Sequence, residues 1–304
     1  MRKLKDRKKM VSRILILTAG ILWGCMGLFV RPFNEKGLNS WDIVFLRAVL
    51  TTVFMAVVLL IKDKSLFKIR LRDMWCFFGT GILSIVFFNL CYFKEITITS
   101  LSVAAILLYT APAFVMIISA FCFKERLTAS KIVALILAFM GLIFVTGVFS
   151  NSEKLTVTTL FIGLGAGLGY ALYSIFSRFA IERGYDSYTI SFYTFLFAAF
   201  TTVFFADGKK VASIVTSSSG SVVLAVIFAL VSTIIPYLTY TIGLKEVENG
   251  QASIIASIEP VAATLIGIVW YKEDLSLSII IGALLVIAGI AVSNSKFSIY
   301  QRSQ

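Results

Sequence analysis

Residues 249–272 read NGQASIIASIEPVAATLIGIVWYK, an apolar run of membrane-spanning length whose only charge between its ends is Glu259, followed directly by Pro260. At 1.5 Å per helical residue, Glu259 lies roughly 16 Å from Glu248 and roughly 20 Å from Lys272, near the middle of a bilayer. A carboxylate is costly there, and a proline removes a backbone donor from a helix. This stretch therefore predicts a membrane helix with an acid and a break at its centre.

Apolar runs of this kind recur along the whole chain. The 304 residues are 59% hydrophobic, with a mean hydropathy of +0.93, so an ordinary soluble domain is excluded. We predict an all-α integral membrane protein. Its spans, about ten in number, are expected near residues 13–31, 41–61, 74–93, 101–122, 128–148, 157–179, 188–206, 221–243, 249–270 and 275–294.

The net charge of +12 comes from basic residues that gather in alternate loops. They form no single basic stripe, so we expect no nucleic-acid partner. The loops and tails on the N-terminal side of the spans carry 20 Lys and Arg residues, and those on the other side carry seven. The positive-inside rule then predicts a multi-pass protein of the cytoplasmic membrane with both termini in the cytoplasm.

The sequence also contains an internal repeat. At an offset of 148, residues 92–145 align with 240–293 without a gap, and at an offset of 147 the front of each half aligns as well. The aligned pairs include Tyr92 and Tyr240, Pro112 and Pro260, Lys124-Glu125 and Lys272-Glu273, Arg31 and Arg178, and Gly37 and Gly184. Because each copy has five spans, an odd number, we predict two inverted copies, which is typical of transporters.

This organisation divides the chain into five parts. We expect a basic cytoplasmic tail at 1–12, a first five-helix repeat at 13–148, a linker at 149–156, a second five-helix repeat at 157–294 and a cytoplasmic tail at 295–304.

Several short motifs, each weak alone, together resemble the EamA family of the drug/metabolite transporter superfamily over nearly the whole chain. They are Glu259-Pro260, the pairs Lys124-Glu125 and Lys272-Glu273, the glycines at 141, 282 and 289, Trp23-Gly24 and Phe45-Leu46-Arg47. Ala134, where the second half has Gly282, departs from the pattern and implies looser packing in the first half.

The resemblance implies a basket of ten helices around a central cavity, lined mainly by the first, third, fourth, sixth, eighth and ninth spans. It also implies small metabolites as substrates, with amino-acid export frequent among relatives.

Two charged residues lie inside the predicted spans. Glu259 either binds a proton or a substrate ammonium group, or is a protonated acid that joins two helices. Arg47, about 9 Å beyond Trp41 by helical rise, either reaches outward to the membrane surface, which we favour, or binds a substrate carboxylate. Both are candidates for proton or charge coupling.

The paired prolines, Pro112 and Pro260, occupy the fourth span of each copy and leave the carbonyls of Leu108 and Ala256 without a helical partner. Either neighbouring side chains such as Ser119 or Thr110 satisfy these carbonyls, or the kink opens onto a watered cavity. Their recurrence favours a hinge or a cavity wall.

The implied cavity spans carry many aromatic and polar side chains. An aromatic wall with a few polar groups suits an amphipathic organic solute. Tyr170 and Tyr193 lie in these spans too, and Tyr193 is also readable as an anchor at the membrane interface. The predicted substrate-binding residues are Trp23, Asn89, Tyr92, Tyr109, Tyr173, Tyr237, Tyr240, Gln251 and Ser257.

The glycine-rich stretch at 163–169 lacks the spacing of a nucleotide-binding loop and indicates close helix contact instead. The chain has four cysteines, all inside predicted spans, and no histidine, so we expect neither a metal nor another cofactor.

The predicted function is a secondary transporter that moves a small amphipathic metabolite, an amino acid or similar solute, by alternating access and in the direction of export. The alternatives are an uptake permease for a sugar, carboxylate or nucleotide-related solute, or a membrane scaffold without transport. An enzyme is not expected, because a Ser-His protease needs a histidine and an aspartyl protease needs two deep aspartates. The expected partners are the lipid bilayer and a small-molecule substrate, with the chain a monomer or a homodimer.

Overall fold

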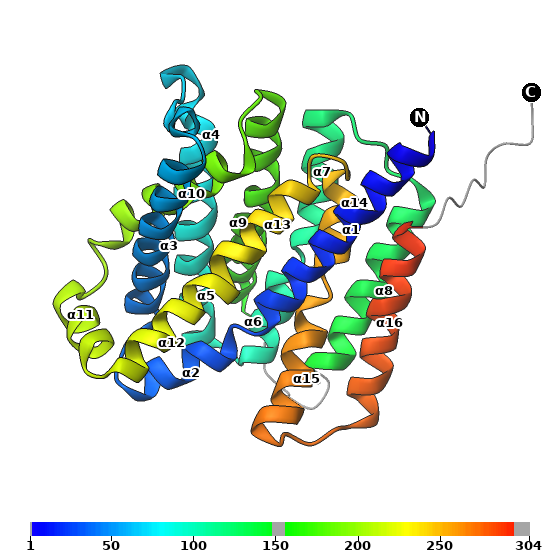
Figure 1. The fold of residues 1–304 in the computed structure, drawn as a ribbon. Helices are drawn as coiled ribbons and strands as arrows, with labels where there is room; N and C mark the ends of the chain where they lie inside the picture. Colours follow the sequence, from blue (N-terminus) through cyan, green and yellow to red (C-terminus); the bar gives the residue numbers. More distant parts are fainter. Residues whose placement is uncertain (1, 148–155, 295–304) are drawn as a thin grey trace, which may run out of the picture.

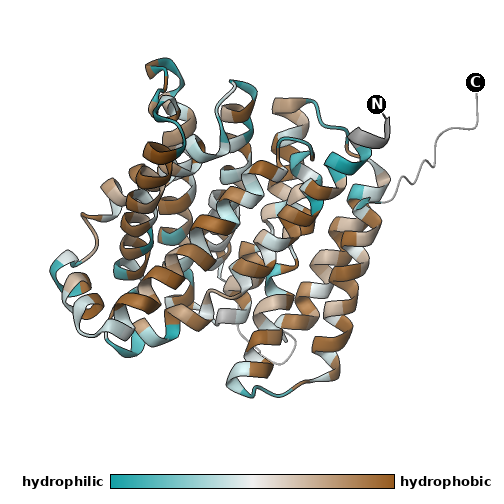
Figure 2. Ribbon diagram, viewed as in Figure 1, coloured by the Kyte–Doolittle hydropathy of each residue, from teal (hydrophilic) through white to brown (hydrophobic). Residues whose placement is uncertain are grey.

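The computed structural model of the chain describes residues 2–147 and 156–294, and the regular elements in these ranges are all helical. Figure 1 shows the helices side by side in one bundle, with the start of α1 and the end of α16 at the same end of it. Nine helical segments in the described ranges are long and apolar enough to cross a membrane. Figure 2 shows hydrophobic residues along the bodies of the helices and hydrophilic ones at their ends, as expected for a multi-pass membrane protein.

The first half contains five of the long helical segments, which we call rods. The 3₁₀ turns Lys64–Phe67 and Leu71–Asp73 connect the second and third rods, and a π-helical segment, Gly79–Val86, lies within the third. The α-helices of this half are α1 (Arg2–Gly24), α2 (Gly27–Glu35), α3 (Ser40–Lys62), α4 (Met74–Phe78), α5 (Phe87–Ile98), α6 (Leu101–Leu108), α7 (Ala111–Phe123) and α8 (Ala129–Thr146).

The second half follows the same plan, with a π-helical segment at Leu230–Ile234. Its α-helices are α9 (Val157–Glu182), α10 (Ser187–Thr202), α11 (Gly208–Thr216), α12 (Ser219–Ala229), α13 (Ile235–Gly243), α14 (Asn249–Ala256), α15 (Glu259–Tyr271) and α16 (Leu277–Asn294). The two halves are not separate domains, because α1 packs on α13, α3 on α10, α5 on α9 and α8 on α16.

The internal repeat predicted from the sequence is present in the structure. Helices α6, α7 and α8 begin and end 148 positions before α14, α15 and α16, and the π-helical segments end at Val86 and Ile234. Lys124 and Lys272 both adopt left-handed backbone angles, with φ of 54° and 56°. Since this conformation is uncommon for residues other than glycine, its recurrence at equivalent positions is strong evidence for two copies of one unit.

The structure differs from the predicted spans at several breaks. The first span is interrupted at Cys25–Met26, and the fourth and ninth are each split where the chain approaches Pro112 or Pro260. Each proline lies in the first turn of the following helix, where a backbone N–H would have no partner within the helix. The seventh span was predicted to reach residue 206, but α10 ends at Thr202.

Two further elements differ from expectation. Helix α1 begins at Arg2, so the segment assigned to a tail at 1–12 is largely helical. Helix α11 lies in a segment read as a loop, where the Asp207 side chain caps it and Val211 is buried against Phe33 and Leu38. Of the predicted linker 149–156, only Thr156 is described, as the N-cap of α9, and the tail at 295–304 lies outside the described residues.

Helices α8 and α16 pack through glycines. A Cβ added to Gly141 would lie 2.6 Å from the Gly282 carbonyl oxygen, and one added to Gly282 would lie 2.5 Å from that of Gly141. Seven residues further along α16, a Cβ added to Gly289 would lie 2.8 Å from the Ala134 carbonyl oxygen. The backbones of α8 and α16 are therefore in direct contact at these glycines.

The glycine-rich stretch at 163–169 serves the close helix contact predicted for it. A Cβ on Gly163 would overlap Leu107 at 2.4 Å, and one on Gly169 would lie 2.9 Å from the Phe88 backbone. Helix α9 thereby approaches α5 and α6 closely.

The α8–α16 contact generates a first prediction. Replacing Gly141→Ala forces a methyl group onto the Gly282 carbonyl and is expected to lower the free energy of unfolding by about 1–3 kcal/mol. Detergent-titration unfolding measures the effect. The matched control is Gly220→Ala, whose added Cβ would meet only the Ser218 hydroxyl at 3.8 Å. Equal stability of the two variants would contradict this account of the packing.

Candidate functional site

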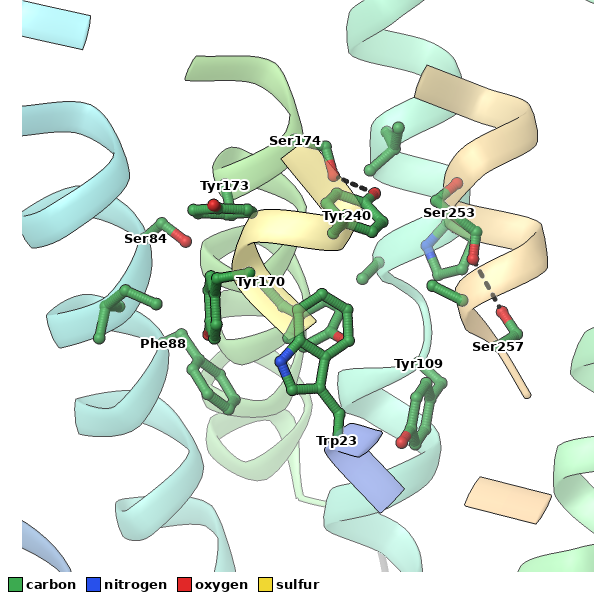
Figure 3. Close-up of a pocket in the computed structure, with 16 residues that line it drawn as sticks. Trp23, Ser84, Phe88, Tyr109, Tyr170, Tyr173, Ser174, Tyr240, Ser253 and Ser257 are labelled. Atoms are coloured by element: carbon green, nitrogen blue, oxygen red, sulfur yellow. Dashed lines mark hydrogen bonds between the residues drawn. The ribbon is translucent and has the colours of Figure 1, made fainter. Parts of the chain in front are cut away.

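A central cavity lies among helices of both halves, and its empty space of about 550 Å³ includes a part that is open to solvent. Figure 3 shows aromatic rings and serine hydroxyls around it. The lining residues, none of them charged, are Trp23, Ser84, Ile85, Phe88, Tyr109, Ala111, Pro112, Val115, Tyr170, Tyr173, Ser174, Tyr237, Tyr240, Ser253, Ala256 and Ser257.

Trp23, near the end of α1, is the centre of the aromatic wall. Its ring lies 5.1 Å from that of Tyr237, 5.3 Å from that of Tyr240 and 6.3 Å from that of Tyr170, mostly edge to face. Its indole N–H is buried and has no hydrogen-bond acceptor among the described residues. A donor in this position is available to a solute.

The hydroxyl groups around the cavity are ordered by bonds between α9 and α13. The Tyr173 hydroxyl lies 2.8 Å from Thr241 Oγ1, and Thr241 donates its proton to the Tyr237 carbonyl. Tyr173 is therefore the donor to Thr241. Ser174 and Tyr240 pair at 2.7 Å. On α14 the Ser253 and Ser257 hydroxyls donate to carbonyls one turn earlier, so their oxygens keep acceptor capacity.

Glu259 is the first residue of α15 and lies just behind the tyrosines of the cavity wall. The Tyr170 hydroxyl donates to its Oε2 at 2.7 Å, and the Tyr109 hydroxyl interacts with the same carboxyl. The N-terminus of a helix also favours a negative charge. The acid therefore touches the cavity through two phenols.

Arg47 on α3 does not reach the membrane surface, so the favoured expectation for it is wrong. The residue is 8% exposed; its Nε donates to Thr233 Oγ1 at 3.0 Å, and a terminal nitrogen donates to the Ser232 carbonyl oxygen at 3.5 Å. These partners belong to the π-helical segment of the other half. The guanidinium also interacts with the Tyr237 hydroxyl, so a buried cation lies behind another tyrosine of the wall.

The structure brings six of the nine predicted binding residues into the cavity wall: Trp23, Tyr109, Tyr173, Tyr237, Tyr240 and Ser257. The other three lie elsewhere. Asn89 donates to the Ile85 carbonyl, Tyr92 packs on Phe88, and Gln251 donates to the Ser293 carbonyl of α16.

Both prolines border cavities. Pro112 lines the central cavity, and both Pro112 and Pro260 line a smaller one of about 260 Å³ beside it. At the first break the Thr110 hydroxyl and the Thr110 backbone N–H both donate to the Leu107 carbonyl, at 2.6 and 3.2 Å, one residue before the Leu108 carbonyl that Pro112 leaves without a helical partner.

Sequence reasoning did not single out six residues of the wall, Ser84, Ile85, Phe88, Val115, Ser174 and Ser253. The recurrence of serine at 253 and 257, one helical turn apart on a membrane helix, was a usable signal. Tyr193 lies away from the cavity, where its hydroxyl donates to the Phe67 carbonyl.

A network of polar groups, in which the side chains of Glu125, Lys131 and Asn249 are buried and Glu248 is exposed, joins α7 and α14 at one end. The Glu125 carboxylate accepts the backbone N–H groups of Asn249 and Gly250, at 2.7 and 3.1 Å, and so caps α14. Lys131 lies 3.5 Å from Glu125 and 2.6 Å from Glu248. Arg178 donates to the Asn249 side chain at 3.0 Å and to the Val247 carbonyl. We call Glu125, Lys131, Arg178, Glu248 and Asn249 the α14 latch.

The equivalent residues at the other end are arranged differently. Glu273, the counterpart of Glu125, pairs with Arg31 at 3.0 Å, and both side chains are about half exposed. Arg31 also stacks on the Tyr271 ring, 3.8 Å from its centroid. Helix α7 packs on α14, whereas the equivalent helices α15 and α6 make no comparable contact within the described ranges.

Within residues 2–147 and 156–294, no three histidine, cysteine, aspartate or glutamate side chains come together as metal ligands would. The cavity wall carries aromatic rings, hydroxyl groups and an indole N–H. Two charged residues outside the wall, Glu259 and Arg47, interact with its tyrosines.

A multi-pass helical bundle built from a repeat, with a cavity between its halves, is the architecture of a membrane transporter. The sequence profile of the EamA-like transporter family matches residues 10–147 and 157–295, once in each half. The chain therefore belongs to the EamA-like transporter family.

Individual relatives agree with this assignment. An uncharacterized transporter of Archaeoglobus fulgidus is 29% identical over 91% of this chain and 94% of its own length. The uncharacterized transporter YxxF of Bacillus subtilis is 24% identical over 95% of this chain and 91% of its own length. A solved crystal structure superposes with a TM-score of 0.77 at 17% identity, covering 93% of this chain and 96% of that one, and shares the fold.

Proposed function

We propose that the chain is a secondary transporter that carries a small amphipathic metabolite, an amino acid or similar solute, out of the cell by alternating access. The observation that carries the proposal is the central cavity, whose uncharged wall comes from both halves and combines aromatic faces with hydroxyl groups. Such a wall suits an organic solute with apolar and polar parts better than a bare ion.

The proposed topology has ten crossings, five in each copy. Besides the nine long segments, α10 is the seventh crossing; its 16 residues span about 24 Å and require some local thinning of the bilayer. With five crossings per copy, the second copy enters the membrane from the opposite face. Inverted copies of this kind allow a bundle to expose one site to each side in turn.

The unequal ends of the bundle support alternating access. The α14 latch holds α7 against α14 at one end, while the equivalent α15 and α6 lie apart at the other. A transporter with two equivalent arrangements has one end closed and one end open at a time.

The closed end is the one at which α1 begins (Figure 1). The excess of basic residues assigns this end to the cytoplasm, together with both termini. In this proposal the cavity is closed towards the cytoplasm and faces the outer side, the state that an exporter adopts after releasing its solute.

Reconstitution tests the proposal. Purified protein in liposomes is expected to show saturable uptake of labelled amino acids or related metabolites, with counterflow when unlabelled solute is trapped inside. Product formation would indicate an enzyme, and the absence of flux and chemistry with every solute would indicate a scaffold.

Glu259 generates a second prediction, since it is the acid nearest the cavity. Glu259→Gln keeps the hydrogen-bond acceptor for Tyr170 but removes the titratable charge. We expect flux driven by a pH gradient to fall to the level driven by the solute gradient alone, with counterflow retained. Glu246→Gln, at an exposed loop position, is the matched control. Unchanged dependence on the pH gradient would exclude Glu259 as the coupling site.

The α14 latch generates a third prediction, measured as access to the cavity from the cytoplasmic side. In a background without the native cysteines, Ser253→Cys reports access through its rate of alkylation by a maleimide. Adding Glu125→Gln weakens two charge-assisted bonds, each worth about 1.5–3 kcal/mol, and is expected to raise that rate about tenfold or more. Glu273→Gln, on the equivalent residue, is expected to leave it unchanged. Equal rates in both variants would contradict a closing role for Glu125.

A further inference from the structure

We propose that Glu95 is a proton-binding site outside the central cavity, occupied while α5 and α9 are in contact at one end of the bundle. Glu95 lies just past the predicted span at 74–93, but α5 continues to Ile98. The long segment that ends at Ile98 is one of the nine that are able to cross a membrane. Glu95 is therefore part of a membrane helix and not of a solvated loop.

The Glu95 carboxyl group is completely buried and unpaired. Its residue is 0% exposed, and neither carboxyl oxygen has a hydrogen-bond partner among the described residues. Asp42 and Asp73 are similarly buried, but each accepts hydrogen bonds and pairs with a lysine or arginine. A carboxylate without such partners bears the full cost of leaving water. The form of Glu95 that this environment accommodates is the neutral acid, with its proton bound.

The contacts of α5 with α9 show where this acid lies. A Cβ added to Gly169 would lie 2.9 Å from the Phe88 backbone, and one added to Gly165 would lie 3.2 Å from Cys91 Sγ. The contact positions rise along α5 as they fall along α9, so the two helices are antiparallel. Glu95 is one turn beyond Cys91 on the same face of α5 and therefore faces the first turns of α9.

The repeat leads to the same place independently. Glu95 aligns with Gly243 at the offset of 148, and a Cβ added to Gly243 would lie 2.8 Å from the Ser12 carbonyl oxygen of α1. At the offset of 147, residues 12–16 of α1 align with 159–163 of α9. The first copy therefore places a carboxyl group between two helices that, in the second copy, are in direct backbone contact.

The helices packed on α5 bring no charged group to Glu95. These are α9, α6 and the π-helical segment of the first half. Neither residues 157–163 of α9 nor the other two segments contain a titratable side chain. On α5 itself, Cys91 and Tyr92 precede the acid by about one turn, and Lys94 is exposed. The proton on Glu95 is therefore held by the apolar surroundings and not by a neighbouring charge.

The position of Glu95 sets the direction of a pH effect. Along the helix it lies about 4.5 Å before the end of α5 and about 10 Å beyond the cavity residue Phe88. In the proposed topology this end of α5 faces the outer side, so the proton exchanges with the outer solution; the site itself does not rest on that assignment. Because the neutral acid is the buried form, the contact between α5 and α9 is strongest at low pH and weakens as the carboxyl group ionises.

Carbodiimide labelling of the purified full-length protein detects the neutral acid directly. Dicyclohexylcarbodiimide, an apolar reagent, adds to a protonated carboxyl group and rearranges to a stable N-acylurea on that residue. Mass spectrometry of the peptides then gives the labelled fraction of each acid. At mildly acidic pH we expect labelling of Glu95 about tenfold or more above that of Glu35, because a preference of one pH unit for the neutral form is a factor of ten. Glu35, the matched control, is exposed at the end of α2.

A substitution links the proton to the helix contact. Glu95→Gln keeps the size of the side chain and removes its ionisation. At acidic pH we expect the variant and the wild type to melt at the same temperature. As the pH rises, the melting temperature of the wild type is expected to fall below that of the variant by about 2 °C or more. Glu35→Gln is expected to follow the wild type at every pH. An acid with a packing role alone would give a difference that does not change with pH.

Two outcomes overturn the inference. Labelling of Glu95 no greater than that of Glu35 would show that no proton is held there, and a melting difference independent of pH would show that protonation is not linked to the helix contact. If Glu95→Gln does not fold, the labelling decides alone, because it uses the unaltered protein. Neither measurement needs a solute, so failure of the proton site leaves the proposed transport function to the liposome flux assay.

Discussion

A backbone carbonyl or N–H group inside a bilayer has no water to bind, so a membrane helix can break only where protein or a water-filled cavity satisfies the freed groups. The rest of this structure depends on that constraint. The first span breaks two residues after Trp23, and the fourth and ninth spans break beside Tyr109 and Ser257. All three of these residues line the central cavity. The interruptions thus collect at the one place where irregular backbone is tolerated, and there they supply the wall for a solute.

Much of this arrangement can be predicted from the sequence. The repeat, Glu259 and the paired prolines follow from period and composition, since a proline in a membrane run has a local and predictable effect. Arg47 was misjudged because its partner, Thr233, lies in the other half of the chain and no local pattern links them. Asn89 and Gln251 were assigned to the right helices, but their side chains bond to backbone carbonyls outside the cavity wall. The face of a buried helix that meets a cavity is decided by packing, which hydropathy along one chain does not encode.

The two copies of the repeat also differ in their packing, although their sequences align. The chain aligns with itself closely enough for the left-handed lysines to recur, yet the two ends of the bundle are not equivalent. The cause is in the sequence. Lys131 of the α14 latch aligns with Ile279, Glu248 with Ser100, and Asn249 with Leu101. The second end keeps the arginine and glutamate, Arg31 and Glu273, but lacks the lysine, the second acid and the amide that join them into a network at the first.

The difference between the two ends of the bundle is relevant to a transport cycle. A buried charged network is stabilising only while every member is paired, and opening it exposes several charges at once. An empty protein with one strong and one weak closure therefore rests with the strong end closed. A solute bound in the cavity shifts that balance only by its difference in affinity between the two states, with a factor of ten for each 1.4 kcal/mol or so. Both charged residues are tied to the second half, because Glu259 begins α15 and Arg47 on α3 binds the π-helical segment between α12 and α13.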